Sequence, residues 1–370
     1  MRKSVVCCLI LMVFLCFAPS ANAEQTEIRI FVNGVQIQMD VAPIIVDGRT
    51  MVPLRAIGEA LDLEVRWIEE YQTAEVWDDR TIVSANLRED FMRWVPHGEG
   101  RSGVGVMMPL DVPPMLYNGR TLVPLRAIAE CFFAIVEWYE DERMITIEPI
   151  PMAERYVDWG PFREGRAWVA VGEPSNRRSG YIDRYGNEVI PLIFHDNNNS
   201  WSDFSEGLAA VRTESGMGYI DRYGNMVMPP IFGLARPFSE GLAVTDNGVI
   251  DRHGEVLFSL PAGVTWSANG FSEGRLAVMS RDGWGVIDTE GNVIVPFRYH
   301  SVGNFSEGFA TVVEICDDRI WRAGYIDRYG NALTPVMFDQ AVRFRNGQGH
   351  VRIGDRWYWI DRDGQRHEFD

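Results

Sequence analysis

The sequence predicts two parts of different fold class: a duplicated α+β N-terminal domain and an all-β repeat domain. Three observations lead to this prediction: an apolar leader, a duplication whose copies keep a constant offset, and two short motifs that recur to the C-terminus. They predict a signal peptide over residues 1–23, the duplicated domain over 24–150 and the repeats over 151–370.

The leader has the pattern of a secretory signal. Arg2 and Lys3 precede an apolar run over residues 5–17, and Ala21-Asn22-Ala23 has the small-x-small form that signal peptidase cleaves. The run is shorter than the roughly 20 residues that span a bilayer. No later stretch of the sequence is long enough either. We therefore expect a secreted protein, associated with the cell envelope and without a membrane span.

Composition excludes several functions. The formal net charge is −17, which repels phosphate backbones and argues against nucleic acid as a partner. Lys3 is the only lysine, so the mature chain has none for a Schiff base or a P-loop. After the leader only Cys131 and Cys316 remain, in different parts of the chain, so no disulfide framework is expected.

The duplication predicts two copies of one α+β unit. GRTMVPLRAIGEAL at Gly48 returns as GRTLVPLRAIAECF at Gly119, and Trp67 returns as Trp138 at the same offset. Each copy reads as a glycine turn, a β run, a short amphipathic helix that begins after a proline, and two further strands. A hairpin is expected upstream, around Asn33-Gly34. Together these elements predict an antiparallel sheet backed by short helices.

This pattern resembles the copper amine oxidase N-terminal-like domain, in tandem, over residues 25–150. In copper amine oxidases that domain is a stalk, so the resemblance implies no catalysis. Catalysis in the family needs an Asn-Tyr-Asp/Glu-Tyr sequence and three copper-binding histidines, two of them in a His-x-His pair. The sequence has neither; its six histidines stand singly, at His97, His195, His253, His300, His350 and His367. We expect no enzyme activity of this type and no cofactor.

From residue 151 two motifs alternate. IDRYGN begins at Ile182, Ile220 and Ile326, and its relatives IDRHGE, IDTEGN and IDRDGQ begin at Ile250, Ile287 and Ile360. The second motif is FREG at Phe162, FSEG at Phe204, Phe238, Phe271 and Phe305, and FRNG at Phe344. Successive Ile-Asp pairs follow one another at similar intervals. The sequence therefore predicts six repeats of three strands each.

The repeats resemble the WG-repeat family over residues 155–370, although only Trp284 keeps the tryptophan of its Trp-Gly pair. The resemblance implies β structure and no defined activity. Units of this length favour a propeller-like closed ring, with an open β-solenoid as the alternative.

IDRYGN is interpreted as a turn. Aspartate would cap backbone N–H groups, glycine would take positive φ, and the isoleucine before them would be buried. A calcium loop needs more oxygen ligands than most copies offer, and only Asp361 and Asp363 approach that pattern. They stay a weak metal candidate.

Two motifs of the repeats could also be interpreted as catalytic. GFSEG matches G-x-S-x-G at Ser272, but no strand-to-helix turn is predicted there. A glycosidase pair could come from the repeated glutamates Glu164, Glu206, Glu240, Glu273 and Glu307. Regular repetition favours a structural role for them, so we predict no catalytic residues. A cell-wall carbohydrate-active enzyme using acidic residues of the repeats is the alternative.

Aromatic residues give the remaining functional prediction. Tryptophans with nearby carboxylates are suited to stacking on sugars, although most large aromatics in thin β units are core. The candidate ligand contacts are Trp201, Trp266, Trp284 and Trp321. We expect a non-enzymatic binding or scaffold protein that recognises a cell-surface protein or glycan, peptidoglycan included, through its repeats.

Overall fold

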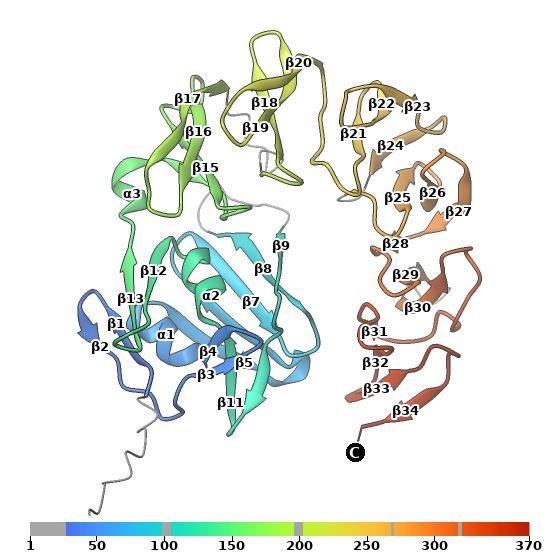
Figure 1. Ribbon diagram of the computed structural model, residues 1–370. Coiled ribbons are helices and arrows are strands. Elements are labelled where there is room, and N and C mark those ends of the chain that lie inside the picture. Colours follow the sequence, from blue (N-terminus) through green and yellow to red (C-terminus); the bar gives the residue numbers. More distant parts are fainter. Residues whose placement is uncertain (1–26, 98–104, 196–202, 268–269, 317–319, 370) are drawn as a thin grey trace, which may run out of the picture.

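The computed structural model describes residues 27–97, 105–195, 203–267, 270–316 and 320–369. The predicted signal peptide lies outside these ranges. The described chain is mostly β, and the repeats follow one another along an arc that curves around the N-terminal unit (Figure 1). No helix in the described ranges is long and apolar enough to cross a membrane.

The centre of the N-terminal unit is symmetric. One sheet has the order β10-β11-β4-β3, from β3 (Ile44–Val46), β4 (Arg49–Pro53), β10 (Met115–Tyr117) and β11 (Arg120–Pro124). Val52 pairs with Val123, its counterpart in the second copy. A local twofold axis therefore passes through the pairing of β4 with β11.

Each copy places a short helix after this sheet, as predicted. Helices α1 (Leu54–Ala60) and α2 (Leu125–Cys131) begin directly after a proline. Their equivalent residues Ile57 and Ile128 are both fully buried in the core of the unit. The apolar stripe read from the sequence is thus the packed face of each helix.

The two flanking sheets break the symmetry. One has the order β12-β13-β1-β2, from β1 (Arg29–Val32), β2 (Val35–Gln36), β12 (Ala134–Tyr139) and β13 (Met144–Pro149). The other has the order β5-β6-β7-β8-β9, from β5 (Glu64–Ile68), β6 (Thr73–Trp77), β7 (Thr81–Asn86), β8 (Phe91–Pro96) and β9 (Val106–Pro109), with the 3-10 helix η1 (Glu69–Tyr71) between β5 and β6.

Two features of these sheets differ from the prediction. β1 pairs with β13 in parallel, so the expectation of a wholly antiparallel sheet is wrong there. The long chain between these strands makes a parallel pair possible. β7 and β8 were not predicted. They follow the first copy and have no equivalent in the second, so the duplication gave no signal for them.

The repeats contain most of the predicted strands. A short helix, α3 (Met152–Arg155), leads into them. The first strands are β15 (Arg166–Val171), β18 (Leu208–Thr213), β21 (Ala243–Thr245), β25 (Arg275–Ser280), β29 (Phe309–Ile315) and β32 (Gly349–Ile353). The second strands are β16 (Arg178–Asp183), β19 (Gly216–Asp221), β22 (Gly248–Ile250), β26 (Gly283–Asp288), β30 (Trp321–Asp327) and β33 (Arg356–Ile360). The third strands are β17 (Glu188–His195), β20 (Met226–Phe232), β23 (Val256–Phe258), β27 (Val293–Tyr299) and β34 (Arg366–Glu368).

The count of three strands per repeat is wrong for part of the array. Several repeats begin with a fourth, short strand that pairs with the first strand: β14 (Asp158–Trp159), β24 (Val264–Ser267), β28 (Ser301–Val302) and β31 (Gln340–Ala341). In the fifth repeat, isolated bridges stand where the third strand is expected. The extra strands are too short for an alternating pattern to reveal.

The IDRYGN turn has the predicted geometry. Oδ1 of Asp221 accepts from the N–H groups of Tyr223 and Asn225, both at 2.9 Å. Oδ2 accepts from the side chain of Asn225 at 2.9 Å, which explains the asparagine of the motif. Gly224 has φ +88°, and Ile220 is fully buried. The hydrogen bonds that close this turn therefore lie within the motif.

The FSEG motif joins successive repeats, a role that the sequence did not reveal. Glu206 and Gly207 form a two-residue hairpin turn with positive φ at both positions. A glutamate is unusual in this conformation. Its Oε2 accepts from the N–H of Gly241 in the next turn, at 3.0 Å, and Ser205 donates to the carbonyl of Phe238 at 2.7 Å. The same bonds recur along the array from Glu164, Glu273 and Glu307.

Aromatic packing follows the same register between repeats. Tyr219, from the second strand of one repeat, meets Phe238 of the next at 4.9 Å between ring centroids. Tyr181 with Phe204, and Tyr325 with Phe344, repeat this edge contact. These rings are buried, so each small core lies between neighbouring repeats.

The sheet β5 to β9 of the N-terminal unit contacts both ends of the array. At the first repeat, Arg163 donates to the carbonyl of Met107, and Arg80 lies 4.6 Å from the ring centroid of Trp159. At the last repeat, Arg343 forms ion pairs with Glu89, at 3.3 Å, and with Asp90. The N-terminal unit thus links the first repeat to the last.

Candidate functional site: paired pockets in the N-terminal unit

The four tryptophans predicted to contact a ligand do not form one site in the described structure. Trp201 lies outside the described residues, and for Trp266 only the backbone, in β24, is described. Trp284 packs against the core cluster around Val286 and Tyr299. Trp321 is 60% exposed, with its ring 4.7 Å from that of His300. Trp284 and Trp321 do not line the pockets described below.

Asp361 and Ser272, which were weighed for metal binding and catalysis, form hydrogen bonds within a repeat and between repeats. Oδ1 of Asp361 accepts from the N–H groups of Asp363 and Gln365, and Oδ2 lies 2.8 Å from His367 Nε2. The bond to His367, followed by these N–H groups, lowers the pKa of Asp361. Within the described ranges, no group of three His, Cys, Asp or Glu side chains is placed to hold a metal. Ser272 donates to the carbonyl of Phe305 at 2.7 Å.

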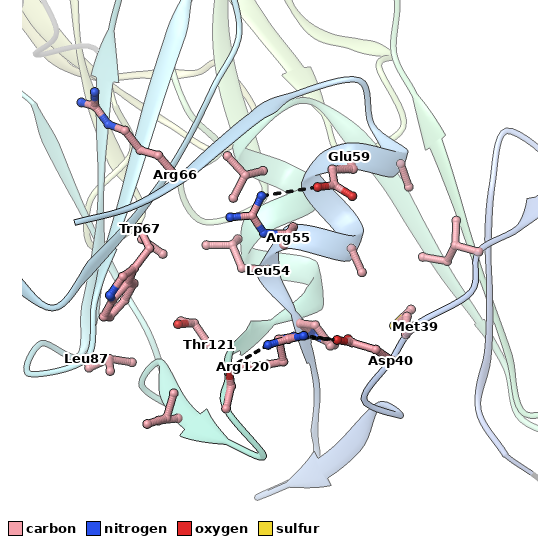
Figure 2. Close-up of a pocket in the computed structure, with 18 of the residues that line it drawn as sticks. Met39, Asp40, Leu54, Arg55, Glu59, Arg66, Trp67, Leu87, Arg120 and Thr121 are labelled. Carbon is pink, nitrogen blue, oxygen red and sulfur yellow. Dashed lines mark hydrogen bonds and ion pairs between the residues drawn. The ribbon is translucent and has the colours of Figure 1, made fainter. Parts of the chain in front are cut away.

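A pocket lies in the N-terminal unit, between α1, the strands β5 and β6, and the β10–β11 hairpin (Figure 2). Its volume is about 930 Å³, within the range of small-molecule sites. Leu54, Val65 and Leu116 supply apolar lining, and Trp67 contributes an indole ring. We call it the first pocket.

A second pocket of about 770 Å³ is its counterpart across the local twofold axis. It lies between α2, β12, β13 and the β3–β4 hairpin. Most positions of the two linings correspond at the offset that relates Gly48 to Gly119. Matching pairs are Asp40 and Asp111, Leu54 and Leu125, Arg55 and Arg126, Glu59 and Glu130, Trp67 and Trp138, and Arg120 and Arg49. The chain therefore builds one pocket twice.

Each pocket draws on both copies. In the first, Arg120 from the second copy donates through Nε to Asp40 of the first copy at 2.6 Å. This hydrogen bond is the main cause that lowers the pKa of Asp40. In the second, Arg49 makes the reciprocal bond to Asp111 at 3.0 Å. Neither copy alone could form either pocket.

The charges around the first pocket are balanced. Arg55 lies 3.5 Å from Glu59 on α1, and Arg66 pairs with Glu75 at 2.6 Å. With Arg120 held by Asp40, each arginine of this lining has a carboxylate partner. Such a lining offers hydrogen-bonding groups without net charge.

The indole of the first pocket is held in place. Trp67 Nε1 donates to Glu69 Oε2 at 2.5 Å, and the other oxygen of Glu69 accepts from the side chain of Gln72 at 2.9 Å. Trp138 in the second pocket is 40% exposed. An indole face beside paired polar groups can stack on an apolar ring face while its neighbours bond to hydroxyl or amide groups.

The sequence contained the signal for these pockets. Glycine, arginine, proline and tryptophan recur at a constant offset between the copies, and the recurring positions include lining residues that face a cavity as well as core residues. The sequence did not show that residues of both copies form each pocket. This depends on the pairing of β4 with β11, which brings Arg120 to Asp40 and Arg49 to Asp111.

Comparison with known families confirms both resemblances. Residues 31–147 match the copper amine oxidase N-terminal domain. Residues 180–215, 217–245 and 284–314 match the WG containing repeat. The first match is to the N-terminal domain of copper amine oxidase and not to its catalytic part.

Individual relatives are distant. A protease inhibitor of Brevibacillus choshinensis is 28% identical over 149 residues, which are 40% of this chain and 40% of that protein. The chain thus spans well under half of that relative. Hsv2 of Kluyveromyces lactis is 12% identical, with a TM-score of 0.34 over 82% of this chain and 91% of that one. AztD of Citrobacter koseri is 11% identical, with a TM-score of 0.34 over 83% and 85%. At these TM-scores nothing further follows from the two structures.

Proposed function

We propose that this chain is a secreted, cell-envelope-associated, non-enzymatic binding protein. In this proposal its six repeats form a propeller-like ring, which the N-terminal unit closes between the first repeat and the last. The contacts of Arg163 with Met107 and of Arg343 with Glu89 support such a closure. The ring would be a scaffold, and the ligand would bind to the paired pockets.

The observation that carries the proposal is that one pocket is built twice. If the duplication served only to build a core, the buried residues of the two copies would stay alike and the residues that line the cavities would differ. Here the duplicates retain an indole, a helix arginine and glutamate, and a cross-copy Arg-Asp bond around each cavity. Retained polar groups that converge on a cavity are typical of a binding site.

The chemistry of the lining favours a saccharide. The arginines of the first pocket are paired with carboxylates, and the chain as a whole is strongly acidic, so anions such as phosphate are disfavoured. A neutral sugar combines an apolar ring face for Trp67 or Trp138 with hydroxyl groups for the surrounding carboxylates and arginines. We therefore propose glycan binding in the N-terminal unit, whereas the sequence suggested the repeats.

The test is a binding screen of the full chain against cell-wall sugars. Purified protein is incubated with N-acetylglucosamine tetramer and with peptidoglycan, and both retention and release of sugar fragments are measured. We expect retention without fragment release, and loss of retention in the double variant Trp67→Ala/Trp138→Ala. The matched control Trp321→Ala, on the repeats, should be retained like the wild type.

Two results would overturn the proposal. Fragment release would favour the carbohydrate-active enzyme instead. Full retention of the double variant would show that the pockets do not carry the binding.

A further inference from the structure

Each pocket has one wall that also contacts an end of the repeat array. For the first pocket, this wall is the turn from Glu69 to Gln72, between β5 and β6. Glu69 and Gln72 line the pocket, while Glu70 between them points to the last repeat. A single turn therefore serves both surfaces.

Glu70 contacts the last repeat through both its side chain and its backbone. Its Oε1 lies 2.6 Å from a guanidinium nitrogen of Arg352, and its carbonyl accepts from Trp357 Nε1 at 3.1 Å. The Arg352 guanidinium also lies 5.6 Å from the ring centroid of Tyr71. The bond from Arg352 is charge-assisted, and the bond from Trp357 holds the backbone of the turn. Glu69 is therefore fixed from outside the pocket, and through Glu69 the indole of Trp67 is fixed as well.

For the second pocket, the corresponding wall is α2 and the residues that follow it. Glu130 and Arg184 both line this pocket and form an ion pair at 3.9 Å. Arg184 belongs to the first repeat. Burial raises the pKa of Glu130, against the attraction of Arg184 and Arg126. The first repeat thus contributes the positive charge of Arg184 to this wall of the second pocket.

Arg184 has a different partner from its equivalents in later repeats. Arg222, Arg252, Arg328 and Arg362 occupy the same motif position, and each pairs with the FSEG or FREG glutamate of an earlier repeat. No repeat precedes Arg184, and Glu130 of α2 takes the place of that glutamate. The N-terminal unit thus replaces a preceding repeat at the edge of the second pocket.

Phe133, just after α2, shows the same adaptation. Its ring lies 5.9 Å from that of Trp159 and 5.4 Å from that of Phe162, both in the first repeat. The equivalent residue of the first copy is the polar Asp62, with nearly the same positive φ. The two copies thus share the backbone conformation at this position, but the second copy has an apolar side chain that packs against the first repeat.

We infer that the two ends of the repeat array position the walls of the two pockets, the last repeat through Arg352 for the first pocket and the first repeat through Arg184 for the second. Arg352 is a positioning residue, since it acts on the ligand through the Glu69–Gln72 turn. Arg184 lines the second pocket itself and also pairs with Glu130. The expected effect of these residues on ligand affinity rests on the proposed function.

The test uses the full chain with one pocket disrupted and combines each such variant with a substitution at one end of the repeat array. Trp138→Ala leaves only the first pocket complete, and Trp67→Ala leaves only the second. Into each background we introduce Arg352→Ala or Arg184→Ala and titrate N-acetylglucosamine tetramer. In the Trp138→Ala background, Arg352→Ala should weaken binding about tenfold. Arg184→Ala should leave the Kd there within about twofold, and the pattern should reverse in the Trp67→Ala background.

Hydrogen exchange supplies a readout that needs no ligand. Arg352→Ala should speed exchange over residues 64–77 and leave residues 134–149 unchanged, because the turn loses its anchor. Arg352→Lys, which keeps the charge, should restore part of the protection. Equal thermal midpoints of the variants would show that the effect is local.

The outcomes separate the two proposals. If the tetramer binds and neither end variant changes its Kd selectively, the inference is wrong and the proposed function stands. If the tetramer binds in neither background, the proposed saccharide function fails, and exchange alone decides the inference. Unchanged exchange over residues 64–77 in Arg352→Ala would overturn it.

Discussion

Repetition serves different purposes in the two regions of the molecule. In the N-terminal unit, two copies face each other across a twofold axis and enclose two equivalent pockets. In the array, six copies follow head to tail, and the motif residues bond within their own turn or to a neighbouring repeat. The comparison teaches that a repeated residue is a site candidate where it lines a cavity and a structural one where it bonds to its neighbour.

The largest expected effect contrasts two tyrosines of the second repeat. Tyr219 is fully buried and donates to the carbonyl of Arg236 at 2.7 Å, whereas Tyr223 is 77% exposed in the turn. Tyr219→Ala should lower the free energy of unfolding by about 3 to 5 kcal/mol. Tyr223→Ala should change it by less than about 0.5 kcal/mol. Urea denaturation of both variants measures this difference, and equal losses would mean that the array does not pack as described.

A second prediction concerns pH at the contact between the N-terminal unit and the last repeat. Burial raises the pKa of Glu89 to about 7, against the attraction of Arg343 and Arg345. Because this folded-state pKa is above the unfolded value, the folded state holds the proton between pH about 4.5 and 7. The contribution of Glu89 to stability therefore falls as pH rises through this window. Glu89→Gln should be more stable than wild type at pH 8, by up to roughly 3 kcal/mol, with the difference vanishing near pH 4.5.

His350 gives the opposite slope and serves as the control for this experiment. Burial lowers its pKa to about 4, helped by Arg88 and Arg345. The unfolded state then binds more protons between pH about 4 and 6.5, so the contribution of His350 to stability is lost as pH falls through that window. His350→Asn should flatten this loss. Thermal unfolding of both variants from pH 4 to 8 separates the two groups, and parallel profiles for wild type and Glu89→Gln would contradict the assignment.

A smaller effect is expected for a single bond between repeats. Glu307 accepts from the N–H groups of Asn346 at 2.6 Å and Gly347 at 2.8 Å, and pairs with Arg362 at 2.8 Å. Glu307→Ala should cost about 1 to 2 kcal/mol, since it removes three hydrogen bonds between the two repeats. Glu214→Ala, at an exposed position in the second repeat, is the matched control. Chemical denaturation with no difference between the two variants would show that the glutamate is dispensable.

The smallest effect is expected at Trp321, which is 60% exposed. Trp321→Ala should alter the free energy of unfolding by no more than about 0.5 kcal/mol. It should also leave sugar binding unchanged if the ligand binds in the N-terminal unit. Loss of sugar binding in this variant would indicate that the ligand binds to the repeats.

Local patterns in the sequence predicted local structure well. The turn chemistry of Asp221 to Asn225 and the helix that begins after Pro53 depend on neighbouring residues, so their sequence was sufficient. The last repeat shows what sequence alone could not explain. Its hairpin turn carries Asn346, a residue that this turn favours, whereas the earlier repeats have glutamate there. Only the structure shows that these glutamates bond to the hairpin turn of the following repeat.

The candidate site was harder to predict for the same reason. Asp40 and Arg120 are far apart in the sequence, and their bond depends on how the two copies pair. Trp67 and Trp138 were visible as a repeated pair, but a repeated tryptophan is compatible with core as well as with a cavity. The contact of Glu70 with Arg352 joins the N-terminal unit to the last repeat and has no local signal.

The most direct test of the paired pockets is the stoichiometry of sugar binding. Isothermal titration of the full chain with N-acetylglucosamine tetramer should give two equivalents for wild type and for Trp321→Ala. It should give one equivalent for Trp67→Ala and for Trp138→Ala, and none for the double variant. Two equivalents in the double variant, or a loss confined to Trp321→Ala, would contradict the account.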